Sequence, residues 1–140
     1  MSTRKIYCIL SLFSLTLGTC MYVLFRENSY IGTVAGNFHI ILNVRALIKP
    51  LSSSFFKFYF PDFLWGFSLC CGLLAIYIPA KKGCLICVGT AISCGCTWEL
   101  LQYLGLVRGT GDLHDMLMYL LAGVLCIIIN IVRSRKYEKA

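Results

Sequence analysis

Four long apolar segments dominate the chain and restrict it to folds in which whole helices are surrounded by hydrocarbon. They cover approximately residues 6–25, 61–79, 84–104 and 113–132. A membrane-spanning helix needs about 20 mostly apolar residues, so we predict a transmembrane helix in each segment. Because 59% of the 140 residues are hydrophobic and 14% are charged, little length remains for a soluble domain. We therefore expect one all-α domain over residues 1–140, a polytopic membrane helical bundle of about four transmembrane helices.

The first apolar segment is predicted to stay attached as a helix. Two basic residues precede it, and residues 17–20 loosely resemble a lipoprotein cleavage site, which would make the segment a signal peptide lipidated at Cys20. However, Thr19 is poorly suited to the position before the cysteine. The apolar run also continues to Phe25, where a mature lipoprotein would turn polar. We favour the retained helix.

Residues 26–60 form the longest connection, and we predict an interfacial segment between the first two spans. Apolar residues at helical spacing lie on one side of this stretch, with His39 and Asn43 on another side. The alternative is a fifth span over residues 30–48, but it would place several polar or basic side chains in the bilayer at a high insertion cost. The aromatic residues 55–60 are typical of a belt at the level of the lipid headgroups.

Basic residues gather at the ends of the predicted spans and indicate the orientation. With four spans, the N terminus, a tight basic turn over residues 79–83 and the C-terminal tail share one side, which holds eight of the 13 basic residues. By the positive-inside rule this side is cytoplasmic. Both termini are therefore predicted to be cytoplasmic in a multi-pass protein of the cell membrane. The formal charge of +7 is read as a topology signal, since no basic stripe with interleaved aromatics indicates nucleic acid.

The cysteines favour helix packing over chemistry. Seven of the nine lie in or beside the apolar spans: Cys70, Cys71, Cys84, Cys87, Cys94, Cys96 and Cys126. Cysteines buried in membrane spans do not form the disulfide framework of an exported loop. Cys84 and Cys87 have the spacing of half a metal site, but neither a second such pair nor a nearby histidine completes it. We expect no metal and no cofactor.

Three of the six acidic residues lie close together between the third and fourth spans. A carboxylate near hydrocarbon costs about 2 to 3 kcal/mol, so it persists where it is paired, wetted or used. We predict a binding site here, at the extracytoplasmic side. Its candidate residues are Glu99, Gln102, Arg108, Asp112 and Asp115. Within it, Glu99 and Arg108 are expected to act together, with Asp115 orienting the arginine.

A structural reading of the same residues remains open. In it, Asp112 caps the fourth helix and Asp115 completes a capping box. Arg108 then simply pairs with either aspartate at the wet interface, which contributes little stability.

These residues resemble a known family. The motif consists of Glu99, Gln102, Arg108, Asp115 and Gly123, and it is similar to the signature of VanZ-like membrane proteins over about residues 95–126. Tyr119 departs from the pattern, because the family often has asparagine there. The resemblance implies a bacterial cell-envelope protein of four short spans, and some members of the family are linked to teicoplanin resistance.

Two classes of function follow. The favoured one is a non-enzymatic protein that binds a polar lipid headgroup, a wall precursor or a glycopeptide, with Arg108 for phosphate or carboxylate and Glu99 with Gln102 as hydrogen-bonding partners. The alternative is an intramembrane hydrolase or transferase acting on a lipid-linked substrate, with Glu99 or Asp115 as general base and His114 or a metal assisting. No serine or cysteine nucleophile is evident beside the carboxylates. A transporter is less supported, because a chain of 140 residues would have to oligomerise to enclose a pathway.

Overall fold

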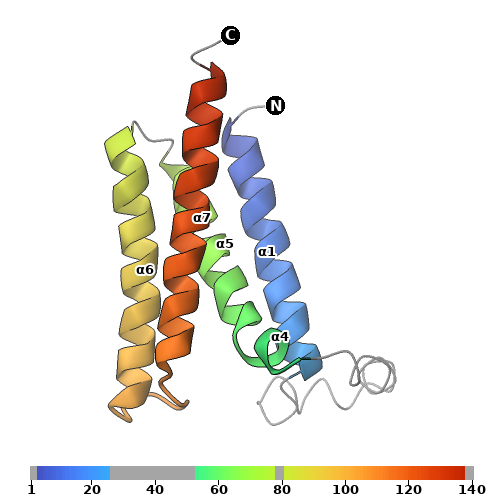
Figure 1. Cartoon of the computed structure of the whole chain (residues 1–140), viewed down its shortest axis with the longest axis vertical. Helices are drawn as coiled ribbons and strands as arrows, with labels where there is room; N and C mark the ends of the chain where they lie inside the picture. Colours follow the sequence, from blue (N-terminus) through green and yellow to red (C-terminus); the bar gives the residue numbers. More distant parts are fainter. Residues whose placement is uncertain (1–2, 26–52, 78–80, 138–140) are drawn as a thin grey trace.

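The computed structural model describes residues 3–25, 53–77 and 81–137, and this part of the chain is an all-α bundle without strands (Figure 1). Its helices are α1 (Thr3–Phe25), α4 (Ser54–Phe58), α5 (Phe60–Ile76), α6 (Lys81–Tyr103) and α7 (Leu113–Tyr137). The interfacial helix and the alternative fifth span, both predicted within residues 30–48, lie outside the described residues.

Three of these helices, α1, α6 and α7, are long and apolar enough to cross a membrane. The α5 helix is equally apolar in character but has 17 residues. At 1.5 Å per residue it is about 25 Å long, which is at the lower end of the range for a spanning helix. The prediction of an all-α membrane bundle is thereby confirmed.

The α5 helix ends at Ile76, three residues before the predicted boundary at residue 79. The residue that precedes a proline disfavours the helical conformation, and Pro79 stands just beyond this end. The guanidinium of Arg4 completes the terminus: its Nε donates to the carbonyl of Ala75 over 3.1 Å, and its Nη2 donates to the carbonyl of Ile76 over 3.5 Å. A cation at a helix C-terminus also complements the helix dipole.

Other predicted boundaries are wrong in the opposite direction, because α6, α7 and also α1, which begins at Thr3 rather than at residue 6, are longer than predicted. The α6 helix begins at Lys81 rather than at residue 84, so residues 81–83 are helical and do not form part of a turn. The α7 helix continues to Tyr137, beyond the predicted end at residue 132. In both cases basic residues extend the helix past its apolar part. Lysine and arginine are good helix formers, so a helix can continue through such residues beyond its apolar part.

The α5 helix lies in the middle of the bundle and packs against α1, α6 and α7 (Figure 1). The beginning of α1, the beginning of α6 and the end of α7 lie at one end of the bundle. The end of α6 and the beginnings of α5 and α7 lie at the other end, together with α4. We call this second end the α6–α7 end.

Small residues bring α1 close to α5. A Cβ atom added to Gly18 would lie 2.9 Å from the ring of Trp65, so glycine is needed at this contact. About two turns before Gly18 along α1, Ser11 forms two hydrogen bonds with Ser68 of α5. The Ser11 hydroxyl donates to the Ser68 carbonyl over 2.9 Å, and the Ser68 hydroxyl donates to the Ser11 carbonyl over 2.8 Å. Close approach of small residues and hydroxyl hydrogen bonds are what hold helices together where lipid removes the hydrophobic drive.

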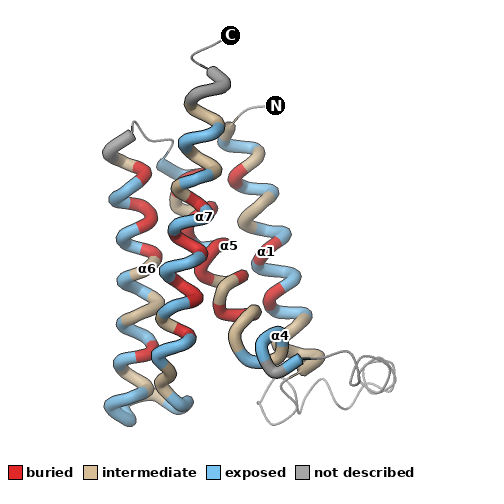
Figure 2. Tube along the Cα trace, in the orientation of Figure 1, coloured by how far each residue is buried: buried red, intermediate tan, exposed pale blue. Residues whose placement is uncertain are grey.

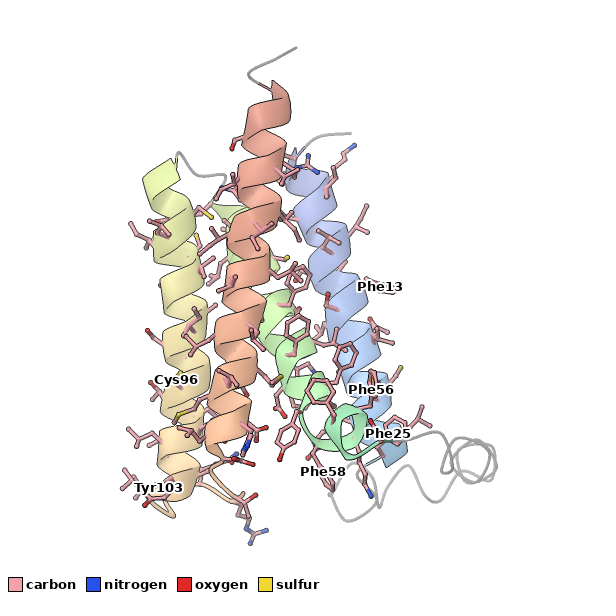
Figure 3. The ribbon with its side chains drawn as sticks, viewed as in Figure 1. Phe13, Phe25, Phe56, Phe58, Cys96 and Tyr103 are labelled. Atoms are coloured by element: carbon pink, nitrogen blue, oxygen red, sulfur yellow. The ribbon has the colours of Figure 1, made fainter. Side chains whose placement is uncertain are left out.

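The buried residues face inward along the helices, and the exposed ones form the outer surface (Figure 2). Phe13 on α1 is one of the exposed residues, and its side chain projects away from the bundle (Figure 3). In a membrane protein such residues face lipid, which is as apolar as they are. Phe56 and Phe58 of the predicted aromatic belt are exposed on α4, at the α6–α7 end.

Candidate functional site

Three buried carboxylates gather at the α6–α7 end, one each from α5, α6 and α7. Asp62 on α5, Glu99 on α6 and Asp115 on α7 are buried residues, 9%, 3% and 8% exposed. All three interact electrostatically with one residue, Tyr119 on α7. We call Asp62, Glu99 and Asp115 the carboxylate cluster.

Tyr119 lies at the centre of this arrangement. Its buried hydroxyl donates to Oδ1 of Asp62 over 3.4 Å. Its ring fills a slot between α5 and α6, because a Cβ atom on Gly66 would come within 2.8 Å of the ring and one on Gly95 within 2.5 Å. Both glycines therefore make room for the ring, and no larger residue fits without moving it.

Helix direction favours negative charge in the cluster. Asp62 lies in the first turn of α5, and Asp115 lies in the first turn of α7. The partial positive charge at a helix N-terminus stabilises a carboxylate there. Two of the three buried carboxylates thus have a local source of stabilisation that does not depend on a ligand.

Glu99 ties the end of α6 to the beginning of α7. Its Oε2 accepts a hydrogen bond from the backbone N–H of Asp112 over 3.3 Å. The contact depends on Gly111, since a Cβ atom there would lie 2.5 Å from the carbonyl oxygen of Glu99 and 2.6 Å from the backbone nitrogen of Tyr103. The loop between the two helices can pack this closely because position 111 has no side chain.

Asp112 caps α7 as predicted. Its Oδ1 accepts the backbone N–H of His114 over 3.0 Å and lies 2.8 Å from Nδ1 of the same histidine. These hydrogen bonds, the backbone one first, hold the pKa of the Asp112 carboxyl below its usual value. His114 is the second residue of α7, so both its backbone N–H and its ring can reach the capping carboxylate.

The predicted capping box is also wrong in one respect. A capping box would direct the N–H of Asp112 to the side chain of the third helical residue, Asp115. That N–H instead donates to Glu99. Asp115 is buried and belongs to the carboxylate cluster inside the bundle, so it is not part of the helix cap.

Arg108 is not brought to Glu99 or Asp115. It is exposed on the loop after α6, and it makes no ion pair or hydrogen bond within the described part of the chain. The loop turns at Gly105, whose φ is +71°, and again at Gly109, whose φ is +146°. These conformations favour glycine, and Arg108, between the two turns, is exposed. The predicted Glu99–Arg108 pair is therefore absent.

Gln102 shares the buried side of α6 with Glu99 but supports the loop. A Cβ atom on Gly109 would lie 2.5 Å from Cδ of Gln102, so the amide packs directly beneath this glycine. Tyr103, next in the chain, projects outward at the end of α6 (Figure 3). Gln102 therefore packs against the loop next to Glu99.

Two members of the site were not among the predicted candidates. Asp62 lies on a different span from all of the predicted candidates, and Tyr119 was noted as a departure from the family motif. Tyr119 follows Asp115 by four residues, and this spacing places both on one helix face. The sequence could therefore have predicted that Tyr119 lies beside Asp115. The position of Asp62 depends on how α5 packs against α7.

The chemistry of the site is that of a hydrogen-bond acceptor. Carboxylate oxygens accept hydrogen bonds from ammonium, amide and hydroxyl groups. Among the described residues, no three histidine, cysteine, aspartate or glutamate side chains are arranged to hold a metal ion. Comparisons with protein-family models, with curated proteins and with solved structures give no match.

Proposed function

We propose that this chain is a VanZ-like integral membrane protein of the bacterial cell envelope that binds a polar lipid, wall-precursor or glycopeptide group at the extracytoplasmic end of its bundle. The observation that carries the proposal is the burial of Asp62, Glu99 and Asp115 around Tyr119. Packing alone does not call for such residues, since apolar side chains of similar volume would fill the same space at less cost.

The composition of the cluster indicates which part of a ligand it would receive. Three carboxylates and a phenol favour a group rich in donors, and an ammonium group is the strongest such partner. Wall precursors, ethanolamine lipids and glycopeptide antibiotics all carry amines. Arg108, exposed at the same end, is available for a phosphate or carboxylate of the same ligand.

A link to glycopeptide resistance is part of the proposal. It rests on the resemblance of the segment around Glu99, Arg108 and Asp115 to the VanZ-like signature. A protein that binds the wall precursor or the antibiotic at the outer membrane surface changes how much antibiotic reaches its target.

Binding to the purified protein tests the proposal. The full chain in lipid nanodiscs is titrated with a lipid-linked peptidoglycan precursor, with teicoplanin and with phosphatidylethanolamine, and phosphatidylglycerol serves as a phospholipid without an amine. We expect saturable binding of at least one amine-bearing probe and none of phosphatidylglycerol. Equal binding of all four probes, or binding of none, would contradict the proposal.

A second candidate function is favoured by one observation, the 2.8 Å contact between Nδ1 of His114 and Asp112. A carboxylate that orients a histidine is a common arrangement for general acid–base catalysis. The backbone of Asp112 also contacts Glu99, so the pair adjoins the cluster. In this alternative the protein is an intramembrane hydrolase or transferase for a lipid-linked substrate. It predicts turnover of the lipid-linked precursor that His114→Ala abolishes while binding is kept; binding without turnover rejects it.

A further inference from the structure

Two arginines lie at the end of the bundle opposite the α6–α7 end. Arg4 is in the first turn of α1 and Arg133 is in the last part of α7, and these two helix ends lie at the same end of the bundle (Figure 1). The candidate membrane spans cover Thr3–Phe25 and Leu113–Ser134, so each arginine is next to the end of its span. Both are therefore expected at the level of the lipid headgroups.

Tyr7 on α1 holds Arg133 in a defined position. Tyr7 is 1% exposed, and its hydroxyl donates to Oδ1 of Asn130 on α7 over 3.0 Å. Cζ of Arg133, one turn further along α7, lies 6.0 Å from the centre of the Tyr7 ring. The face of an aromatic ring attracts a guanidinium group. The arginine is therefore oriented toward α1 by a ring that is itself fixed.

The guanidinium of Arg133 is covered on one side only. Its Nε is buried and has no hydrogen-bond partner among the described residues. Its two Nη nitrogens make no hydrogen bond within that part of the chain either, but they are not buried, and the residue as a whole is half-buried. The accessible edge with both Nη groups is the part of arginine that binds phosphate oxygens in pairs.

Arg4 supplies a second oriented guanidinium beside Tyr7. It precedes Tyr7 by three residues, so both lie on one face of α1. Its Nε and Nη2 donate to the carbonyls of Ala75 and Ile76, which fixes the side chain at the end of α5. The arginine is nevertheless exposed, and its Nη1 makes no hydrogen bond in the described part of the chain. Tyr7 thus has one guanidinium with open donors beside it from each of the two helices.

No carboxylate within the described residues neutralises these two cations. Neither arginine forms an ion pair there. The acidic residues of the described part all lie toward the α6–α7 end: Asp62, Glu99, Asp112 and Asp115. An anion that balances the two guanidinium groups must therefore come from outside this part of the chain, and the groups are placed to receive it at the membrane surface.

Apolar side chains continue from the two arginines toward the middle of the bundle. Leu10 lies one turn beyond Tyr7 on α1, and Ile127 lies one turn before Asn130 on α7, and both are partly buried hydrophobic residues. Among the described residues, no Cα atom of α1 lies within 8 Å of one in α7. The two helices are therefore joined here by side chains. An acyl chain that lies along this side of the bundle meets apolar surface directly below the charged groups.

We propose that Arg4 and Arg133 bind the headgroup of a phospholipid with two phosphates, such as cardiolipin, with one phosphate on each guanidinium. Basic pockets between membrane helices bind such headgroups. Each arginine is anchored on its own helix, so a lipid that carries two linked phosphates can engage both. The second contact forms within the same complex, and this makes two linked phosphates bind more tightly than one. The site is separate from the carboxylate cluster, which lies at the other end of the bundle.

Native mass spectrometry of the full chain in detergent tests the site. The protein is titrated with cardiolipin, with phosphatidylglycerol as an anionic lipid with one phosphate, and with pyrophosphate as a diphosphate without acyl chains. We expect saturable binding of cardiolipin and no saturable binding of the other two probes in the same concentration range. Failure of cardiolipin to bind overturns the proposal. Saturable binding of phosphatidylglycerol or pyrophosphate in that range also overturns it, because two phosphates or the acyl chains would then not be needed.

Matched variants identify the residues. Arg133→Gln should lower the affinity for cardiolipin about tenfold, since it removes charged hydrogen bonds to phosphate. Lys5→Gln removes the same charge from the same end and should leave the affinity unchanged, because the exposed Lys5 lies two residues before Tyr7, on another side of α1. Equal losses in the two variants would show unspecific attraction of charge and overturn the assignment.

A further variant keeps the test valid if Arg133→Gln does not fold, as judged by circular dichroism. Arg133→Lys keeps the charge but cannot bind phosphate with two parallel hydrogen bonds, so its affinity for cardiolipin should still be lower than that of the wild type. Wild-type affinity in a folded Arg133→Lys protein overturns the proposal. Glu99→Gln should leave cardiolipin binding unchanged, which separates this site from the carboxylate cluster.

Discussion

The hydroxyl of Tyr119 donates a hydrogen bond to Oδ1 of Asp62 over 3.4 Å, and this contact joins the second turn of α7 to the first turn of α5 inside the bundle. The ring can reach Asp62 because Gly66 and Gly95 leave a slot for it. Tyr119 thus connects the packing of three helices with the carboxylate cluster. Substitutions of Tyr119 and of the glycines around its ring therefore test the geometry of the site.

Removal of this hydroxyl should weaken the bundle slightly. Tyr119→Phe keeps the ring in its slot but takes a donor from the buried Asp62, and such hydrogen bonds are worth about 0.5 to 1.5 kcal/mol. We expect a loss of free energy of unfolding in this range, measured by titration with a denaturing detergent. The control is Tyr103→Phe, since Tyr103 is 77% exposed and should change stability little. Equal effects of the two substitutions would show that the Tyr119 hydroxyl contributes nothing specific.

Filling the slot should cost more than removing the hydroxyl. In Gly95→Ala the new Cβ meets the Tyr119 ring at 2.5 Å, and the ring has Gly66 on its other side. Overpacking of this kind costs about 1 to 3 kcal/mol. Gly89→Ala is the matched control on the same helix, because no atom lies within 4 Å of its added Cβ, and alanine favours a helix over glycine. Should both variants unfold alike, the slot does not exist as described.

The cap of α7 should give a measurable pH dependence. The pKa of Asp112 is lowered in the folded protein by hydrogen bonds from His114, so the ionised carboxyl stabilises the fold above the pKa of the unfolded chain. This contribution is lost as the pH falls through the lowered value. We expect wild-type stability to decline relative to Asp112→Asn as the pH falls below the pKa of an ordinary aspartate, about 3.9. NMR titration of the Asp112 carboxyl carbon provides the check, and a pKa at or above that of an ordinary aspartate would contradict the cap.

The orientation in the membrane can be decided by reporter fusions. Because basic residues flank the cytoplasmic ends of spans, alkaline phosphatase fused after Gly109 should be active and the same enzyme fused after Lys82 should be inactive. A reporter that is active in the cytoplasm should give the opposite pattern. The reverse result for both reporters would place the carboxylate cluster on the cytoplasmic side and remove the wall precursor as a ligand.

The sequence predicted the helices well and the contacts between them less well. Hydropathy over about 20 residues is a strong signal, and it located α1, α6 and α7 as spanning helices. The helix ends were harder to place, because Lys81 and the residues up to Tyr137 are polar yet helical. Local capping was predictable from Asp112 alone, since a cap depends on the next few residues.

The sequence predicted only some of the residues of the carboxylate cluster. Glu99 and Asp115 were recognised because charge is costly within an apolar segment. Tyr119 and Asp62 come together through the register of α5 against α7 and through two glycines in different helices. Arg108 has the right spacing for a partner of Glu99, but two glycine turns place it outside the cluster. The spacing of residues along the sequence predicts neither the contact between Tyr119 and Asp62 nor the position of Arg108.

The most direct test of the proposed site is the affinity of the nanodisc-embedded protein for the lipid-linked peptidoglycan precursor, compared between the wild type and Glu99→Gln. Glutamine keeps the size of the side chain and an oxygen that can accept the N–H of Asp112, so the unliganded fold should keep its thermal stability. We predict that affinity falls about tenfold, which corresponds to about 1.4 kcal/mol, while Arg108→Gln alters affinity independently of Glu99. Unchanged affinity in a Glu99→Gln variant of unchanged stability would contradict a binding role for the carboxylate cluster.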